Sequence, residues 1–418
     1  MIDHDQLIES LGQSGRAAAR QLAHSTAEQR NGGLIAAAKL IGQRQSELLS
    51  ANQADLASAD ARGLAPAMVD RLRLDPDRLD AIADGLTSIA QLPDPIDRVL
   101  ADWTQPNGLQ IQRIAVPIGV IGVIYESRPN VTIDAAALCV KSGNAVILRG
   151  GSEAVNSNRA LHEALSDGLE QAGLSAEAAQ FVPTQDRDAV GALLRAHQSL
   201  DLVVPRGGKG LVKRVQDEAR VPVLAHLDGN NHLYIDASAD PEMAKNIVIN
   251  AKMRRPGICG ALETLLIDQA WSDNAPKLLT DLIESGCELR GDESICAMDS
   301  AINAAQPDDW DTEYLAPTLS IRLVEDSDDA LDHIQRHGSG HTDGIIAEDT
   351  DAAQYFLARL DSAIAVHNAS TQFADGGEFG FGAEIGIATG RLHARGPVGL
   401  EQLTTFQYRV MGSGQTRP

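Results

Sequence analysis

The side chain best suited to covalent chemistry is Cys259, which follows the run Met253-Arg254-Arg255-Pro256-Gly257-Ile258. We predict a helix over Pro241–Met253, and the Pro-Gly pair predicts a turn after it. Cationic neighbours and a helix terminus lower the pKa of a thiol and so raise its thiolate fraction. We expect the other cysteines to be small core residues: Cys139, Cys287 and Cys296.

Asn130 is a second polar group of interest, because it follows a predicted buried strand in Ser127-Arg128-Pro129-Asn130. Asparagine is favoured at helix N-caps, so a capping role is one interpretation. A functional amide is the other, and local sequence alone does not separate the two.

Glycine-rich strand ends occur at Arg149-Gly150-Gly151-Ser152, Pro205-Arg206-Gly207-Gly208-Lys209-Gly210 and Asp228-Gly229. Glycine lets the backbone approach a phosphate, and a following helix N-terminus favours its charge. None matches the dinucleotide or Walker patterns. Two of them have flanking Arg or Lys, which favours a nucleotide site.

The histidines and one long loop complete the set of polar candidates. His226, His232, His341 and His393 have no spacing typical of metal ligands, so we predict no metal site. The glycine-rich stretch Asn368–Gly386 is long for a loop, which favours a binding segment or disorder.

These residues are positioned by an alternation of predicted strands and helices. Residues 1–100 read as helical, Trp103–Arg113 as a strand or hairpin, and Val116–Tyr125 as a strand buried on both faces. We expect a helix over Asp134–Lys141. The later segments that we predict are strands at Ala145–Leu148, Leu202–Val204, Leu233–Ile235, Thr264–Ile267, Leu319–Val324, Ala363–Val366 and Thr404–Val410, and a helix at Asp349–Leu360. The alternation predicts an α/β fold with a mostly parallel, doubly wound sheet.

Composition limits the classes of protein. A chain of 418 residues predicts two or three domains. The formal charge of −23 argues against nucleic acid as a partner. No apolar stretch is long enough to span a membrane. The N-terminus, Met1-Ile2-Asp3-His4-Asp5, lacks the pattern of a signal peptide, and the cysteines are unpaired in spacing, so we expect a cytoplasmic protein.

Taken together, the motifs resemble the γ-glutamyl phosphate reductase family of the aldehyde dehydrogenase superfamily. The resemblance extends from the N-terminal helices to Gly412, and its motifs are Gly119–Thr132, Ile147–Ala154, Arg255–Cys259, His337–Thr342 and Asp375–Gly380. It implies a Rossmann-like NADP-binding domain from residues 1–100 and 116–231, and a catalytic α/β domain from residues 232–390. A small β flap for oligomerisation and a C-terminal segment are implied for residues 101–115 and 391–418.

The resemblance also implies an activity, the NADPH-dependent reduction of L-glutamyl 5-phosphate to L-glutamate 5-semialdehyde and phosphate in proline biosynthesis. It implies NADP(H) as cofactor and a homo-oligomer, either dimer or tetramer. A transient contact with glutamate 5-kinase is an expectation that the sequence leaves open.

Residue roles follow from the same resemblance. Cys259 matches the nucleophile, and Asn130 matches the amide that forms an oxyanion hole with the backbone N–H of Cys259. The implied cofactor-binding residues are Arg149, Gly150 and Ser152 at the 2′-phosphate, Arg206, Gly207 and Gly208 near the nicotinamide, and Glu313 at its ribose. The candidates for the substrate's phosphate and α-carboxylate are Arg128, Arg255 and Arg395, with Arg254 as a weaker one.

One departure separates this chain from hydrolytic aldehyde dehydrogenases. Where those carry a glutamate base, this sequence reads Ala225-His226-Leu227-Asp228-Gly229, with His226 as the nearest match. A base that activates water would hydrolyse a thioester, so its absence suits a reductase that exchanges phosphate. It leaves the proton donor unassigned, and we assign no role to Asn230-Asn231-His232. The alternatives are a non-phosphorylating aldehyde dehydrogenase and a catalytically silent oligomeric scaffold.

Overall fold

A computed structural model describes residues 3–417 and divides the chain into two compact units. The first unit comprises Met1–Ala225, Phe381–Gly386 and Val398–Pro418, and the second comprises His226–Gly380 and Ile387–Pro397. Met1, Ile2 and Pro418, which belong to the predicted segments 1–100 and 391–418, lie outside the described residues. Of the two segments predicted as the flap and C-terminal segment, the first unit contains 101–115 and the part of 391–418 from Val398 onward, whereas residues 391–397 belong to the second unit. The functional roles of the domains stay predictions.

The first unit starts with a layer of helices, which confirms the helical prediction for this part of the chain. They are α1 (His4–Ala23), α2 (Ala27–Gln43), α3 (Gln45–Ala61), α4 (Pro66–Leu72) and α5 (Pro76–Gln91). Sequence signals set their starts. Asp3 caps α1 with its carboxylate, and Thr26 and Gln29 form a capping box on α2.

The sheet of the first unit is parallel, with strand order β5-β4-β3-β6. Its elements are β3 (Val120–Tyr125), α6 (Asn130–Lys141), β4 (Ala145–Arg149), α7 (Val155–Gln171), β5 (Ala179–Phe181), α8 (Asp188–Arg195), β6 (Leu202–Arg206) and α9 (Lys209–Glu218). The chain runs from β3 outward to β4 and β5, and then returns to place β6 on the other side of β3. The strand order therefore reverses at the boundary between β3 and β6. Ligands of open α/β sheets bind at such a switch point, beyond the carboxyl ends of the strands.

Two predicted boundaries were wrong. The run Val116–Tyr125 is not one strand, because Gly119 adopts φ of 136° and separates β2 (Gln110–Pro117) from β3. The helix predicted from Asp134 starts four residues earlier, at Asn130. Asn130 is therefore its first residue and not its cap.

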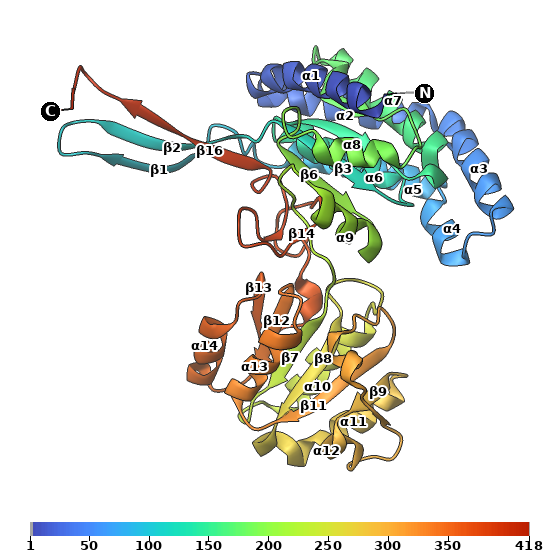
Figure 1. Cartoon of the computed structure of the whole chain (residues 1–418), viewed down its shortest axis with the longest axis vertical. Helices are drawn as coiled ribbons and strands as arrows, with labels where there is room; N and C mark the ends of the chain where they lie inside the picture. The colour runs from blue at the N-terminus through green and yellow to red at the C-terminus, as the bar shows by residue number, and fades with distance from the viewer. Residues whose placement is uncertain (1–2, 418) are drawn as a thin grey trace. The chain divides into compact units, whose positions relative to one another are not determined.

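A three-stranded antiparallel sheet, β1-β2-β16, extends from the first unit as an arm (Figure 1). It pairs β1 (Val99–Thr104) with β2, and β2 with β16 (Thr404–Met411). Its large apolar side chains are unusually exposed, between 36 % and 57 % of their surface: Val99, Leu100, Trp103, Phe406, Tyr408, Val410 and Met411. Such a surface is typical of a protein–protein interface.

The second unit is built on a larger parallel sheet with strand order β10-β9-β11-β8-β7-β12-β13. Its elements are β7 (Asn231–Ile235), α10 (Pro241–Met253), β8 (Leu262–Asp268), α11 (Ala275–Glu284), β9 (Glu288–Gly291), α12 (Glu293–Cys296), β10 (Asn303–Ala304), β11 (Thr318–Val324), α13 (Ser327–His337), β12 (Thr342–Ile346), α14 (Thr350–Arg359) and β13 (Ile364–His367), with a short pair formed by β14 (Ile387–Ala388) and β15 (Gly396–Pro397). Together the two parallel sheets confirm the predicted α/β class.

No helix among residues 3–417 combines the length and the apolar character needed to cross a membrane.

A buried histidine in the second unit makes its stability sensitive to acid. His333 is 5 % exposed, and its Nδ1 accepts a hydrogen bond from Arg322 Nη1. Burial, together with smaller effects of the nearby His232, His337, Arg322 and Arg336, lowers the pKa of His333 to about 2. The imidazole is therefore neutral in the native state, whereas it titrates near 6.5 in an unfolded chain.

We expect His333→Gln to weaken this acid sensitivity. Below pH 6.5 the unfolded wild-type chain binds a proton at residue 333 that the native chain does not bind. The contribution of the neutral His333 to the free energy of unfolding is thus fully present above about pH 6.5. Below that pH it falls by roughly 1.4 kcal/mol per pH unit. Urea unfolding at pH 7.5, 6.0 and 5.0 measures the effect. Parallel pH profiles for wild type and variant would contradict the prediction.

Candidate active site

The loop that carries Cys259 is closed at its base by a buried ion pair. Lys252, at the end of α10, contacts Glu263, at the start of β8, at 2.6 Å between Nζ and Oε2, and both side chains are fully buried. Burial raises the pKa of Glu263 to about 7, although the charge of Lys252 acts to lower it. Because the two residues flank Arg254–Ala261, the pair fixes the ends of the loop.

The backbone of Cys259 is held from β7. Asn231 Nδ2 donates to the carbonyl oxygens of Cys259 and Ala261, each at 2.7 Å, and Asn231 Oδ1 accepts from Thr342 N at 3.1 Å. A Cβ atom at Gly229 would lie 2.0 Å from the Cys259 carbonyl oxygen, so a side chain there would push the loop away. Asn231 received no role from the sequence. Its contacts make it a positioning residue for the backbone of Cys259.

Two imidazoles lie next to the thiol. His226, Cys259 and His341 each offer a donor atom, and the three atoms lie within 4.8 Å of one another. His226 Nδ1 is 2.9 Å from the carbonyl oxygen of Ile387, and the rings of His226 and His341 are 5.0 Å apart between centroids. A carbonyl only accepts, so Nδ1 carries the proton and Nε2 of the neutral ring carries the lone pair. The spacing in the sequence did not predict this cluster.

His341 differs from His226 in its burial. It is fully buried, and burial, together with a smaller effect of His226, lowers its pKa to about 3. Its Nδ1 lies 2.9 Å from Thr342 Oγ1. His341 is therefore a neutral imidazole close to the thiol.

The remaining cysteines have structural surroundings. Cys139 and Cys287 are buried, and burial raises the pKa of both thiols, to about 12 for Cys287. Cys296 is half-buried, with Sγ directed at the carbonyl oxygens of Gly291 and Asn303. The prediction of core positions is confirmed for Cys139 and Cys287 but was too strong for Cys296.

In the first unit, two glycine turns flank the switch point of the sheet. A Cβ atom at Gly150 would lie 2.2 Å from Asn158 Nδ2, and one at Gly207 would lie 2.5 Å from Glu126 Oε2. The Gly208 N–H, at the start of α9, donates to Glu126 Oε2 at 2.9 Å. An anionic group thus already occupies this helix N-terminus, as expected for a site with affinity for phosphate.

Arg149 lies at the carboxyl end of β4, but its guanidinium is largely committed to the protein. It is 8 % exposed and donates to the carbonyl oxygens of Gly150, Gln185 and Asp186, while its Nε is buried without a hydrogen-bond partner. Burial lowers its pKa, and so do the neighbouring charges of Arg187 and Arg214. The sequence missed Arg187 and Arg214, since neither belongs to a recognised motif. The three guanidiniums fit a nucleotide phosphate.

Asn130 lines a cavity of about 410 Å³ formed by α4, α5 and the start of α6. Its Nδ2 donates to Asp134 Oδ2 at 2.8 Å. Burial raises the pKa of Asp134, against the lowering effects of Asn130 and Arg206. The other charged residues of the cavity are Asp70, Arg71, Arg73, Arg78 and Arg128. Guanidiniums can pair with carboxylate groups of a ligand and carboxylates with an ammonium group. The cavity therefore suits an amino-acid derivative, which carries both kinds of charge.

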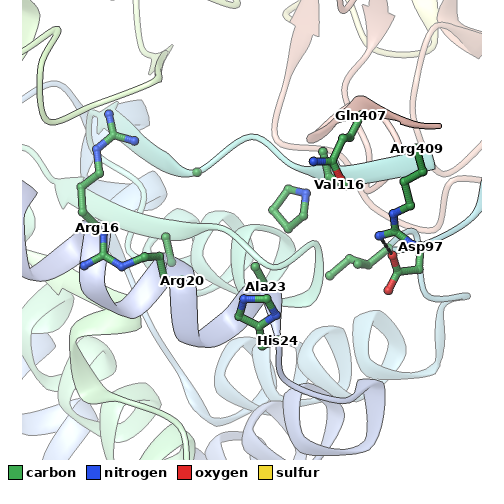
Figure 2. A pocket seen from close by; sticks show the side chains of 12 residues that line it. Arg16, Arg20, Ala23, His24, Asp97, Val116, Gln407 and Arg409 are labelled. Atoms are coloured by element: carbon green, nitrogen blue, oxygen red, sulfur yellow. Dashed lines mark hydrogen bonds and ion pairs between the residues drawn. The ribbon is translucent and has the colours of Figure 1, made fainter. Parts of the chain in front are cut away.

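A second arginine-rich cavity of the first unit, about 430 Å³, lies between α1 and the base of the arm (Figure 2). Arg16 and Arg20 come from α1, and Arg409 comes from β16. Two of these cations are already paired, Arg16 with Asp201 and Arg409 with Asp97. The cavity contains none of the catalytic, cofactor-binding or substrate-binding residues predicted from sequence, and it shares no lining residue with the cavity beside Asn130.

The other predicted residues are placed as follows. Glu313 Oε1 accepts from the Gly229 N–H at 2.9 Å, beside the Cys259 loop. Arg395 pairs with Asp361, and Arg255 is exposed. Ser152 Oγ lies 3.5 Å from Glu153 Oε2. Their binding roles stay predictions.

Comparison with known proteins identifies the class. Residues 4–308 match the aldehyde dehydrogenase family. An acetylating aldehyde dehydrogenase from Geobacillus thermoglucosidasius is 19 % identical and superposes with a TM-score of 0.69 over 99 % of this chain and 98 % of that one, which shows the shared fold. The chain therefore belongs to the aldehyde dehydrogenase family, whose members use a nicotinamide cofactor.

Closer relatives narrow this assignment. The chain is 59 % identical to a γ-glutamyl phosphate reductase of Novosphingobium aromaticivorans, over 99 % of this chain and 97 % of that protein. The crystal structure of a γ-glutamyl phosphate reductase from Thermotoga maritima is 41 % identical and has a TM-score of 0.96, with 99 % and 100 % coverage. Within the wider family, the chain belongs with the γ-glutamyl phosphate reductases.

Proposed function

We propose that this chain catalyses the NADPH-dependent reduction of L-glutamyl 5-phosphate to L-glutamate 5-semialdehyde and inorganic phosphate, the second step of proline biosynthesis from glutamate. The observation that carries the proposal is the 59 % identity to a γ-glutamyl phosphate reductase over nearly the whole chain.

Cys259 is the proposed nucleophile. His226 Nε2, with its lone pair fixed by the Nδ1–H bond to Ile387, takes the thiol proton. The thiolate attacks the acyl carbon, a C–S bond forms, and the C–O bond to phosphate breaks. The proton on His226 passes to the departing phosphate, which leaves as hydrogen phosphate.

The second half of the reaction converts the thioester to the aldehyde. A bound nicotinamide cofactor supplies the hydride. Asn130 and the Cys259 N–H stabilise the oxyanion that develops on the former acyl oxygen. The carbonyl then re-forms, the C–S bond breaks, and Cys259 returns as the thiolate. In this scheme His226 acts where hydrolytic relatives hold a carboxylate.

The direct test is the reverse reaction, in which semialdehyde and NADP⁺ are supplied with and without inorganic phosphate. Absorbance at the nicotinamide band should rise only when phosphate is present. Oxidation at an equal rate without phosphate would instead favour a non-phosphorylating aldehyde dehydrogenase. A folded chain without either activity would favour the silent scaffold.

The cavity beside Asn130 is the proposed site for the amino-acid end of the substrate. Arg71 and Arg73 line it, are exposed, and form no ion pair within residues 3–417. We assign them to the α-carboxylate, together with Arg128, and assign Asp70 to the α-ammonium group. Guanidinium binds carboxylate in bidentate fashion, which fixes the substrate's orientation as well as its affinity.

We therefore expect Arg71→Ala and Arg73→Ala each to raise the KM for glutamate semialdehyde about tenfold, since a charged hydrogen bond contributes roughly 1.5–3 kcal/mol. An aliphatic aldehyde without the α-carboxylate should react equally with wild type and variants. Arg20→Ala, in the separate cavity of Figure 2, is the matched control and should behave as wild type. Unchanged KM values in both cavity variants would overturn the assignment.

Preference for NADPH is proposed to depend on the group Arg149, Arg187 and Arg214. Arg187 is exposed and has no ion pair among the described residues, so we expect it to contact the 2′-phosphate directly. Arg187→Ala should raise the KM for NADPH about tenfold and leave that for NADH unchanged. Arg149→Ala should act in the same direction, with an added loss of stability because three backbone carbonyls lose a donor. Arg195→Ala, an exposed arginine of α8, is the control for Arg187, and equal shifts for both cofactors would count against the 2′-phosphate role.

The arm β1-β2-β16 supports the proposal that the enzyme is a homo-oligomer, because contact with another subunit would bury its exposed aromatic and aliphatic side chains. The number of subunits and a contact with glutamate 5-kinase remain expectations.

A further inference from the structure

His341 is a buried polar group that the proposed reaction does not use. It is fully buried, and its Nε2 has no hydrogen-bond partner among the described residues. An unpaired polar atom in a protein interior costs free energy, on the order of 1–3 kcal/mol. A ring nitrogen of His341 also belongs to the cluster with His226 and Cys259, whose donor atoms lie within 4.8 Å of one another. Its position therefore points to a ligand.

Each of the two imidazoles has a hydrogen-bonding contact at Nδ1, which decides on which ring nitrogen the lone pair lies. Ile387 O accepts from His226 Nδ1, which leaves the lone pair of His226 on Nε2. Thr342 Oγ1 can accept from His341 Nδ1, which likewise leaves a lone pair on His341 Nε2. Histidines that bind metals are commonly held in this way, with the second nitrogen donating to a carbonyl or hydroxyl oxygen.

The donor set is one thiolate sulfur and two imidazole nitrogens. Sulfur and nitrogen ligands in tetrahedral arrangement suit Zn²⁺ and exclude hard cations such as Mg²⁺. Donor atoms around zinc are about 3.5 Å apart, as the Zn–S and Zn–N bond lengths require. The three donor atoms here lie within 4.8 Å of one another, so side-chain rotations that move them by about an ångström would bring all three to zinc-binding distance. Water would take the fourth position.

We propose that Cys259, His226 and His341 form a binding site for a zinc-class cation, and that the bound metal reversibly blocks the nucleophile. Binding transfers the thiol proton to solvent and ties up the sulfur lone pair that would attack the acyl phosphate. It also engages His226, the proposed base. The enzyme thus has a metal-inhibited state from which a chelator restores activity. The inhibition rests on the proposed function, but the binding does not.

The experiment titrates Zn²⁺ into the metal-free full-length enzyme and follows heat by calorimetry. Co²⁺ serves as a spectroscopic probe, since a thiolate ligand gives a charge-transfer band in the near ultraviolet. We expect one high-affinity cation per chain, protection of Cys259 from iodoacetamide by Zn²⁺, and no binding of Mg²⁺. Activity should fall with the same Zn²⁺ dependence and return when a chelator is added.

Two changes isolate the ligands. His341→Asn should weaken Zn²⁺ binding at least tenfold, and prior alkylation of Cys259 in the wild type should abolish the charge-transfer band. His367→Asn is the matched control, because His367 is a half-buried histidine of the same unit that contacts Ala347 O, and it should bind as wild type. Circular dichroism and thermal unfolding check that the variants fold, and the alkylation arm needs no variant.

The proposal is overturned if Zn²⁺ does not bind, if binding survives alkylation of Cys259, or if folded His341→Asn binds as tightly as wild type. An active reductase that ignores Zn²⁺ would leave the proposed function intact. A chain that binds Zn²⁺ through these residues but lacks reductase activity would refute the proposed function alone.

Discussion

Replacing Cys259 with serine is expected to lower kcat for phosphate-dependent semialdehyde oxidation by roughly 10⁴-fold or more, the scale seen when a nucleophile is removed. A serine hydroxyl is scarcely ionised near neutral pH, and an imidazole beside it does not compensate for the lost thiolate. The fold should be unaffected. The loop is held through the Cys259 carbonyl oxygen by Asn231, and through the pair Lys252–Glu263, neither of which involves sulfur.

The matched control is Cys296→Ser. Cys296 is also half-buried and lies in the same unit, but its sulfur faces two backbone carbonyls. We expect its kcat to stay within about twofold of wild type, because a serine hydroxyl can donate to the same carbonyls and Cys296 does not belong to the cluster of Cys259, His226 and His341. Steady-state rates and thermal unfolding of both variants provide the measurement. Substantial activity in Cys259→Ser would show that the nucleophile lies elsewhere.

Replacing Asn130 with alanine should reduce kcat by about 10²–10³-fold, as found when one oxyanion-hole donor is removed. KM for the semialdehyde should change little, since the amide acts on charge that appears only in the transition state. The amide donates to Asp134 at 2.8 Å, so the proposed role requires it to exchange that acceptor for the substrate oxygen.

Asn107→Ala provides the comparison, since Asn107 is an exposed asparagine of the same unit in the β1–β2 turn. Rates and KM values for both variants, with thermal unfolding as a check, decide the matter. If Asn130→Ala lost stability in step with activity, the amide would be structural. An unchanged kcat would remove it from the mechanism.

The fold was predictable because its signals are local. Alternating strands and helices specified the parallel sheets, and α10 occupies the same residues, Pro241–Met253, as its prediction. The prediction of one strand over Val116–Tyr125 was wrong because the hydrophobic residues continue across Gly119, whereas the backbone changes direction there. A φ of 136° leaves no trace in an apolar pattern, apart from the glycine itself.

The site was predictable only in part. Cys259 and Asn130 stood out through recognisable motifs. Asn231 did not, because a side chain that binds the carbonyls of Cys259 and Ala261 from another strand has no signature in sequence spacing. His226 and His341 are 115 residues apart in the sequence. They lie together near the thiol because the fold brings their two loops to the same part of one sheet. Arg71 and Arg73 were likewise invisible, because cavity walls come from tertiary packing.

The carboxylate of Glu126 affects how an anionic ligand binds to and leaves the glycine turn at Gly207–Gly208. It already receives the N–H of Gly208, so a phosphate that binds there arrives by exchange and not by simple addition. Exchange makes the turn selective for strong, multiply charged anions, since a weak one cannot outcompete a tethered carboxylate of high effective concentration. It also gives the departing ligand an internal replacement. A bound nucleotide would therefore be exchanged quickly between turnovers, and the helix N-terminus would never be left without an anionic partner.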